Sequence, residues 1–182
     1  MNKLVIASAF TLAAFSTSAQ LYGEIGVTSI KIEEATPGLN LESSPAAIRG
    51  VLGYEINPNL AVEGLVALGI GDDELRGNGQ EIPGVKVEMS SVFGIYAKPK
   101  VNFTPELEGF VRVGYARSKI TTEAPAGAEA STSKSGFSYG LGVSYALSPQ
   151  ISLNVDYMSY LDQTDPDDAK LTGLAFGASY TF

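Results

Sequence analysis

The chain has 182 residues and a formal net charge of −8, and it contains neither cysteine nor histidine. This composition excludes disulfides, thiolate metal sites and cysteine nucleophiles, and it removes the usual general base and the commonest metal ligand. The acidic balance argues against a nucleic-acid partner, because phosphate binding needs clustered lysine and arginine.

The N-terminus has the pattern of a secretory signal. Lys3 provides the positive start, the run from Leu4 to Phe15 is mostly apolar, and Thr17-Ser18-Ala19 forms a small-residue cleavage site. We therefore predict a signal peptide over residues 1–19 and a single domain over residues 20–182. The apolar run is too short to be a membrane helix, and no later segment is long enough for one.

The rest of the chain is a succession of segments in which large apolar residues alternate with small or polar ones. Because side chains along a strand point to opposite faces in turn, this period of two predicts strands with one apolar face. Eight strands are predicted, over residues 21–31, 48–56, 60–71, 85–98, 107–118, 136–147, 151–160 and 171–182.

Short and long connections alternate between these strands. The short ones, 57–59, 102–106 and 148–150, each carry a proline, and the long ones are 32–47, 72–84, 119–135 and 161–170. An up-and-down barrel has this rhythm, with tight turns at one end and long loops at the other. We expect the Ala/Thr/Ser/Glu-rich segment 121–135 to be mobile. The acidic segment 162–168 lacks the spacing of a calcium loop, so we interpret it as a solvated loop rather than a metal site.

The last strand indicates which face is outside. Leu174, Phe176, Ala178, Tyr180 and Phe182 share one face, and small residues occupy the other. Small residues fit the crowded interior of a narrow barrel, whereas the large apolar face suits lipid. An even number of strands places both termini and the short turns on the periplasmic side. Outward aromatic residues then form two girdles, a periplasmic one of Tyr54, Tyr145, Tyr180 and Phe182 and an external one of Tyr115, Phe137, Tyr139 and Tyr157. The predicted fold is all-β: an eight-stranded, antiparallel, up-and-down transmembrane β-barrel.

The signal peptide, the alternating strands, the proline-bearing turns and the terminal Tyr180-Thr181-Phe182 resemble the OmpA/OmpX-like family of small outer membrane β-barrels. The resemblance covers the whole mature chain. It implies location in the outer membrane, contact with membrane lipid and lipopolysaccharide, and recognition by the barrel assembly machinery of a C-terminal signal comprising Phe176, Tyr180 and Phe182. Because the chain ends with the barrel, we do not expect the peptidoglycan-binding domain of full OmpA-type proteins.

Charged residues on the inward face are the candidate site. They are Glu24, Arg49, Glu55, Glu63, Glu88, Lys98, Glu108, Arg112 and Asp156. Around the turn at Pro105, the predicted register sets Lys98 opposite Glu108 and Arg112 opposite Gly94, whose missing side chain would let the guanidinium reach carboxylates across the lumen. Buried charges must pair, so we favour ion pairs that fill the lumen over a gate in a channel. The resembled family has comparable networks.

These observations predict a non-enzymatic outer membrane protein with a structural role in envelope integrity and surface contact. It is expected to be a monomer that needs no cofactor or metal. One alternative is a narrow, weakly cation-selective channel, because carboxylates outnumber cations in the predicted lumen. Another is a loop-based adhesin. A carboxylate pair such as Glu55 and Glu63 could in principle do glycosidase chemistry, but a closed lumen offers no substrate access.

Overall fold

The fold is known from a computed structural model, which describes residues 20–36, 39–70, 72–77, 80–124, 128–161 and 170–182. Nearly all of these residues lie in strands. Within the described ranges, no helix is long and apolar enough to cross a membrane. The strands are β1 (Leu21–Thr36), β2 (Leu39–Ser43), β3 (Ala46–Asn57), β4 (Leu60–Gly69), β5 (Asp72–Gly77), β6 (Gln80–Asn102), β7 (Leu107–Ala124), β8 (Ala128–Ala146), β9 (Ile151–Leu161) and β10 (Lys170–Thr181).

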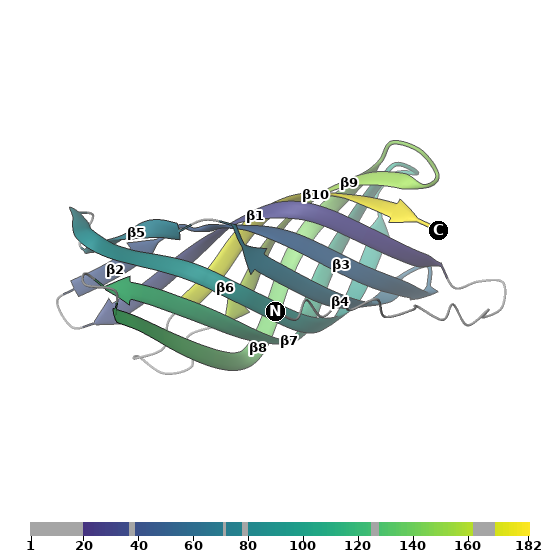
Figure 1. Ribbon diagram of the computed structural model, residues 1–182. Helices are drawn as coiled ribbons and strands as arrows, with labels where there is room; N and C mark the ends of the chain where they lie inside the picture. The colour runs from purple at the N-terminus through teal and green to yellow at the C-terminus, as the bar shows by residue number, and fades with distance from the viewer. Residues whose placement is uncertain (1–19, 37–38, 71, 78–79, 125–127, 162–169) are drawn as a thin grey trace, which may run out of the picture.

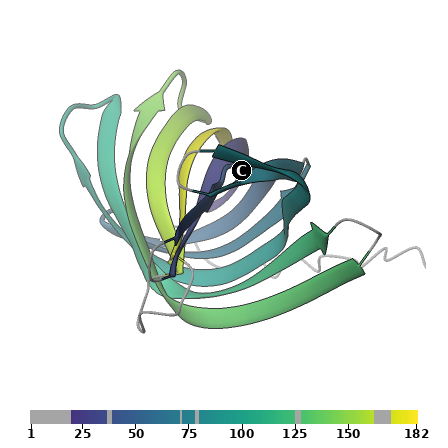
Figure 2. The same cartoon turned by 90° about the vertical axis from the view of Figure 1, so that its left-hand side faces the viewer.

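Eight of these strands form a closed antiparallel barrel, as predicted. The order around the wall is β10-β9-β8-β7-β6-β4-β3-β1, and pairing of β1 with β10 closes it. Figure 1 shows the strands tilted along a common axis, and Figure 2 shows them curving around that axis. The turns after β3, β6 and β8 define one end of the barrel, which we call the short-turn end.

The opposite end carries a strand extension, formed by β2, β5 and the adjoining ends of β1, β6, β7 and β8 (Figure 1). Three segments predicted as long loops are therefore largely strand. In particular, residues 121–124 and 128–135 belong to β7 and β8 rather than to a mobile loop. The predicted acidic loop at 162–168 lies outside the described residues.

The alternation of side chains places the large apolar residues on the outer surface. Ile95, Leu141 and Phe176 are among the exposed ones, and all members of both predicted aromatic girdles are exposed as well. In the wall, residues of opposite parity point inward and are buried or half-buried. Exposed apolar side chains all round a barrel require an apolar surrounding, so this wall is built for lipid.

The predicted register between β6 and β7 is wrong by four residues. Gly94 pairs with Ala116, and Glu108 pairs with Asn102. The turn is centred on Pro105, because the Thr104 hydroxyl accepts hydrogen bonds from the backbone N–H groups of Glu106 and Leu107 at 3.2 and 3.0 Å. A side chain at Gly94 would overlap the Tyr96 ring, so this glycine makes room for the tyrosine rather than for Arg112.

Candidate functional site

Five charged side chains from five strands meet inside the barrel. Alternation turns each of them inward, and the barrel wall excludes solvent from all of them. We call this set the lumen network: Glu24 of β1, Arg49 of β3, Glu63 of β4, Arg112 of β7 and Asp156 of β9.

Arg112 lies at the centre of the lumen network. Its Nε donates to Glu63 Oε2 at 2.5 Å, its Nη1 donates to Asp156 Oδ2 at 2.9 Å and its Nη2 donates to Glu24 Oε2 at 3.1 Å. One guanidinium therefore joins carboxylates from three other strands. The planar fork of arginine suits this task, because it presents several donors in fixed directions.

Arg49 makes a second fork beside the first. Its Nη1 and Nη2 donate to the two oxygens of Asp156 at 2.7 and 2.6 Å, and Nη2 also donates to Glu24. Glu24 and Asp156 are thus shared by both arginines, so the five side chains form one connected unit rather than separate ion pairs.

Uncharged groups complete the lumen network. The Tyr22 hydroxyl donates to Glu63, and Asn154 Nδ2 donates to Glu24 Oε2 at 3.2 Å. The Tyr22 ring lies against Gly53, where a side chain would occupy the same space. The glycine therefore determines where the ring lies and, through it, how the hydroxyl reaches the carboxylate.

A looser cluster of charges lies nearer the short-turn end. Lys100 pairs with Glu55 and with Glu108 Oε2 at 3.1 Å. Lys98 Nζ lies 3.8 Å from Glu108 Oε1 and 3.6 Å from Glu63 Oε1, and 4.3 Å from the centre of the Phe110 ring. Lys98 thus connects this cluster to the lumen network.

Toward the strand extension, the lumen is closed by apolar side chains instead of charges. We call these residues the apolar layer. They are buried and form one contiguous cluster with neighbouring alanines and Tyr96: Ile30, Ile32, Val51, Leu65, Val92, Met158, Tyr160, Leu161 and Leu171. The prediction that ion pairs fill the lumen is therefore wrong for this half of the barrel. Its aliphatic side chains demand no hydrogen-bond partners, whereas the buried Tyr160 hydroxyl has none among the described residues.

The comparison with known families decides the class of this barrel. The family model of the outer membrane protein beta-barrel domain matches residues 4–182. The chain belongs to this family. The protein is accordingly located in the outer membrane and is in contact with its lipid. No curated protein matches the chain.

Several solved structures share the fold. The attachment invasion locus protein Ail of Yersinia pestis, crystallised with the heparin analogue sucrose octasulfate, has 20% identity and a TM-score of 0.62, over 91% of this chain and 100% of that one. Neisserial surface protein A has 16% identity and a TM-score of 0.63 over the same shares. The outer membrane protein AlkL has 16% identity and a TM-score of 0.55, over 100% of this chain and 97% of that one.

Of the nine charged residues predicted for the site, the structure brings five into the lumen network and places Glu55, Lys98 and Glu108 in the adjoining cluster. Glu88 is not part of it. This residue pairs with Asp72 of β5 and Thr121 of β7, within the strand extension, and its side chain lies outside the described residues. A register shift between Met89 and Ser91 separates it from the lumen-facing part of β6.

Sequence reasoning missed Tyr22, Lys100 and Asn154 as members of these clusters. Each shares the inward parity of a residue that was selected, and Lys100 follows Lys98 on the same face of β6. Adding Lys100 and removing Glu88 leaves the two clusters with five carboxylates and four cations, so the predicted excess of carboxylates nearly disappears. Within the described ranges, no group of three carboxylates is placed to hold a metal ion.

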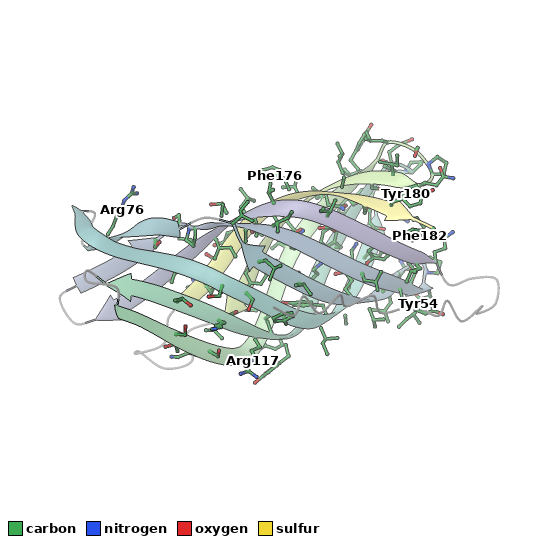
Figure 3. The ribbon with its side chains drawn as sticks, in the orientation of Figure 1. Tyr54, Arg76, Arg117, Phe176, Tyr180 and Phe182 are labelled. Atoms are coloured by element: carbon green, nitrogen blue, oxygen red, sulfur yellow. The ribbon has the colours of Figure 1, made fainter. Side chains whose placement is uncertain are left out.

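The residues of the predicted C-terminal signal lie on the outer surface of β10 and, for Phe182, directly after it. Phe176, Tyr180 and Phe182 are exposed, and the last two rings meet edge to face with centroids 5.3 Å apart. Figure 3 shows Tyr180 and Phe182 near Tyr54, at the short-turn end.

Proposed function

We propose that the protein is a non-enzymatic, structural component of the outer membrane that supports the envelope and presents its strand extension for contact at the cell surface. The observation that carries this proposal is the double closure of the lumen, by the lumen network and the apolar layer. A barrel whose described lumen is closed in this way has its outer wall and its exposed end with which to act.

The first test is conductance. Purified protein in planar bilayers is expected to give no current above leak, because a permeating ion would have to cross both the ion pairs around Arg112 and the buried apolar layer. Steady, cation-selective current would contradict the structural role and support the alternative of a narrow channel.

The second test is envelope integrity. A strain without the protein is expected to become more sensitive to detergents and to large antibiotics that the outer membrane normally excludes. The wild-type gene should restore resistance, and so should a variant with the β7–β8 hairpin shortened beyond Lys119 and Ser133, which pair with each other. The two proteins must reach the outer membrane in equal amounts. Unchanged sensitivity of the deletion strain would contradict the envelope role.

Surface contact is supported by the strand extension, which continues the wall of the barrel beyond the apolar band. Two proteins of the same fold are named for attachment and for the cell surface. Adhesion of cells carrying the wild-type protein or the shortened hairpin to host cells and to matrix would test this part separately. Equal adhesion of the two strains would show that the hairpin takes no part in surface contact.

A comparison of the lipid mass profile of cells with and without the protein tests the non-enzymatic assignment, and no change in the profile is expected.

We further propose cleavage after Ala19, assembly through the C-terminal strand, and a monomeric state. The first is supported by the participation of residues 20 and 21 in the barrel: β1 begins at Leu21, and the Gln20 carbonyl accepts a hydrogen bond from the Glu55 N–H at 3.0 Å. The intact mass of the mature protein checks the cleavage site.

Assembly through the C-terminal strand is tested by deleting Phe182. The deletion should lower the amount of folded protein in cells more than it lowers refolding of the purified chain, whereas Leu147→Ala, at the same end of the barrel, should affect neither. Light scattering of the purified protein checks the monomer.

A further inference from the structure

The first residue of the mature chain lies at the mouth of the lumen, at the short-turn end. The proposed cleavage after Ala19 makes this residue Gln20, whose carbonyl accepts a hydrogen bond from the Glu55 N–H of β3 at 3.0 Å. The ladder continues with Leu21 opposite Tyr54. Gln20 and Glu55 therefore lie directly opposite each other, and opposite residues hold their Cβ atoms about 4.5–5.5 Å apart on one face of the sheet.

Gln20 and Glu55 line the same pocket, which has a volume of about 490 Å³. Lys100 of β6 lines it as well, and its Nζ donates to Glu55 and lies 3.1 Å from Glu108 Oε2. An ammonium group has three N–H donors, so one of them is available beyond these two contacts. A carboxylate and an ammonium with a spare donor thus lie beside the point where the mature chain begins.

A glutamine at the N-terminus can react with itself. Its α-amine attacks Cδ of its own side chain, so that a bond between Nα and Cδ forms, the bond between Cδ and Nε2 breaks, and one ammonia leaves. The product is a five-membered lactam, pyroglutamate, and no other reactant is consumed. α-Amino groups have pKa values of about 7.7–8.0, so a fraction of them is neutral and nucleophilic at neutral pH. The attack is intramolecular, and it is helped further by a base for the amine proton and a donor to the developing oxyanion.

We propose that the mature protein carries pyroglutamate at position 20, and that the pocket promotes closure of the ring. Glu55 takes a proton from the attacking Nα and returns it to the leaving Nε2, while the spare N–H of Lys100 stabilises the negative charge on the side-chain oxygen. Closure also removes the positive charge of the N-terminus, which would otherwise lie near the ammonium of Lys100. The reaction occurs once per chain, so it involves no turnover of a substrate.

The first test is the intact mass of the protein purified from the outer membrane. The proposal rests on cleavage after Ala19, and not on the structural role of the barrel. The expected mass is that of residues 20–182 less one ammonia, and stepwise sequencing from the N-terminus should release no residue. Q20A, which cannot close, should give the mass of the open chain and a readable sequence. The mass of an open Gln20 chain would overturn the proposal. A mass that starts at another residue would overturn it through the cleavage site, so the two failures are distinguishable.

The second test measures how the pocket affects the rate. The mature chain is made with a removable N-terminal extension, whose removal leaves Gln20 as the first residue. The sample is then divided between detergent micelles, where it folds, and guanidinium chloride, where it stays unfolded, and the loss of ammonia is followed by mass. The folded chain is expected to close at least about tenfold faster, because a positioned proton-transfer group usually contributes about 10²–10⁴-fold.

Two variants assign this rate to the pocket. Folded E55Q should close at least about tenfold more slowly than wild type, since an amide cannot accept the proton. The matched variant E106Q removes a carboxylate from a turn at the same end that does not line the pocket, and it should close at the wild-type rate. Equal rates for E55Q and wild type would overturn the role of the pocket. So would equal rates for the folded and unfolded wild-type chain, a comparison that stays decisive even if E55Q folds poorly.

Discussion

Arg112 and Glu63 are joined by two hydrogen bonds, from Nε to Oε2 at 2.5 Å and from Nη2 to Oε1 at 3.3 Å, and neither side chain is accessible to solvent. The pair links β7 to β4 across the lumen, and the two strands are separated by β6 in the wall. It therefore braces the barrel in a direction that the backbone ladder does not. Without Arg112, the buried Glu63 carboxylate would keep only the Tyr22 hydroxyl and Lys98, 3.6 Å away, as partners.

Replacing Arg112 by methionine should destabilise the barrel strongly. The change leaves Glu63 without its main partner and removes one of the two arginines shared by Glu24 and Asp156. Loss of one partner from a buried ion pair costs about 3–5 kcal/mol. Urea unfolding of the protein in lipid vesicles, followed by the change in electrophoretic mobility between folded and heated forms, measures the loss.

Two further variants make this experiment specific. Arg117→Met removes the same charge from the outer surface and should change the free energy of unfolding by no more than about 0.5 kcal/mol. Combining Arg112→Met with Glu63→Gln should cost less than the sum of the single changes, because the double variant leaves no unpaired carboxylate at position 63. Strict additivity would mean that the two side chains are not coupled.

Gly53 should tolerate no side chain. An added Cβ would overlap the Tyr22 ring, which must then move and withdraw its hydroxyl from Glu63. Gly53→Ala is expected to cost about 1–3 kcal/mol of unfolding free energy, as overpacking usually does. Gly50, three residues earlier on β3, has no neighbour within 4 Å of such a Cβ and serves as the control. Equal unfolding midpoints for the two alanine variants would contradict the contact.

The apolar layer should behave as a protein core even though it lies inside a membrane barrel. Leu171 is fully buried in it, whereas Leu174 on the same strand is 43% exposed on the outer surface. Leu171→Ala is expected to cost about 2–5 kcal/mol because it leaves a cavity. Leu174→Ala should cost clearly less, since lipid chains fill the space. Urea unfolding of both variants in vesicles decides, and equal losses would show that the layer is loosely packed.

The direction of each side chain in the wall could be predicted from the sequence, because alternation depends only on the period of a strand. This is why Glu24, Arg49, Glu63, Arg112 and Asp156 were assigned to the interior before any register was known. The contacts among these five side chains could not be predicted in the same way. The pattern along one strand does not determine its register with the next strand. That register depends on turn geometry such as that around Thr104.

The strand extension was missed for a related reason. Beyond the lipid neither face needs to be apolar, so the alternation fades although the backbone ladder continues. Thr121 and Ser131 illustrate this: they are cross-strand partners linked through their hydroxyls, in a stretch whose composition suggested a mobile loop. The apolar layer could not be predicted either, because inward residues such as Ile30 and Met158 lie on strands far apart in the sequence, and only the closed wall brings them together.

The assignment of the outer face can be tested by depth. Leu141 is 68% exposed and lies on β8 midway between Phe137 and Tyr145, which belong to opposite girdles. Leu141→Arg therefore places a charge at the centre of the lipid-facing band and should cost about 2–4 kcal/mol, whereas Ser135→Arg, beyond the external girdle on the same face, should cost no more than about 1 kcal/mol. Unfolding of both variants in vesicles gives the comparison. Such a difference in unfolding free energy between the two positions arises only if the apolar surface contacts lipid. Similar costs at the two positions would mean that the surface around Leu141 contacts water, which would contradict the assignment of the outer face.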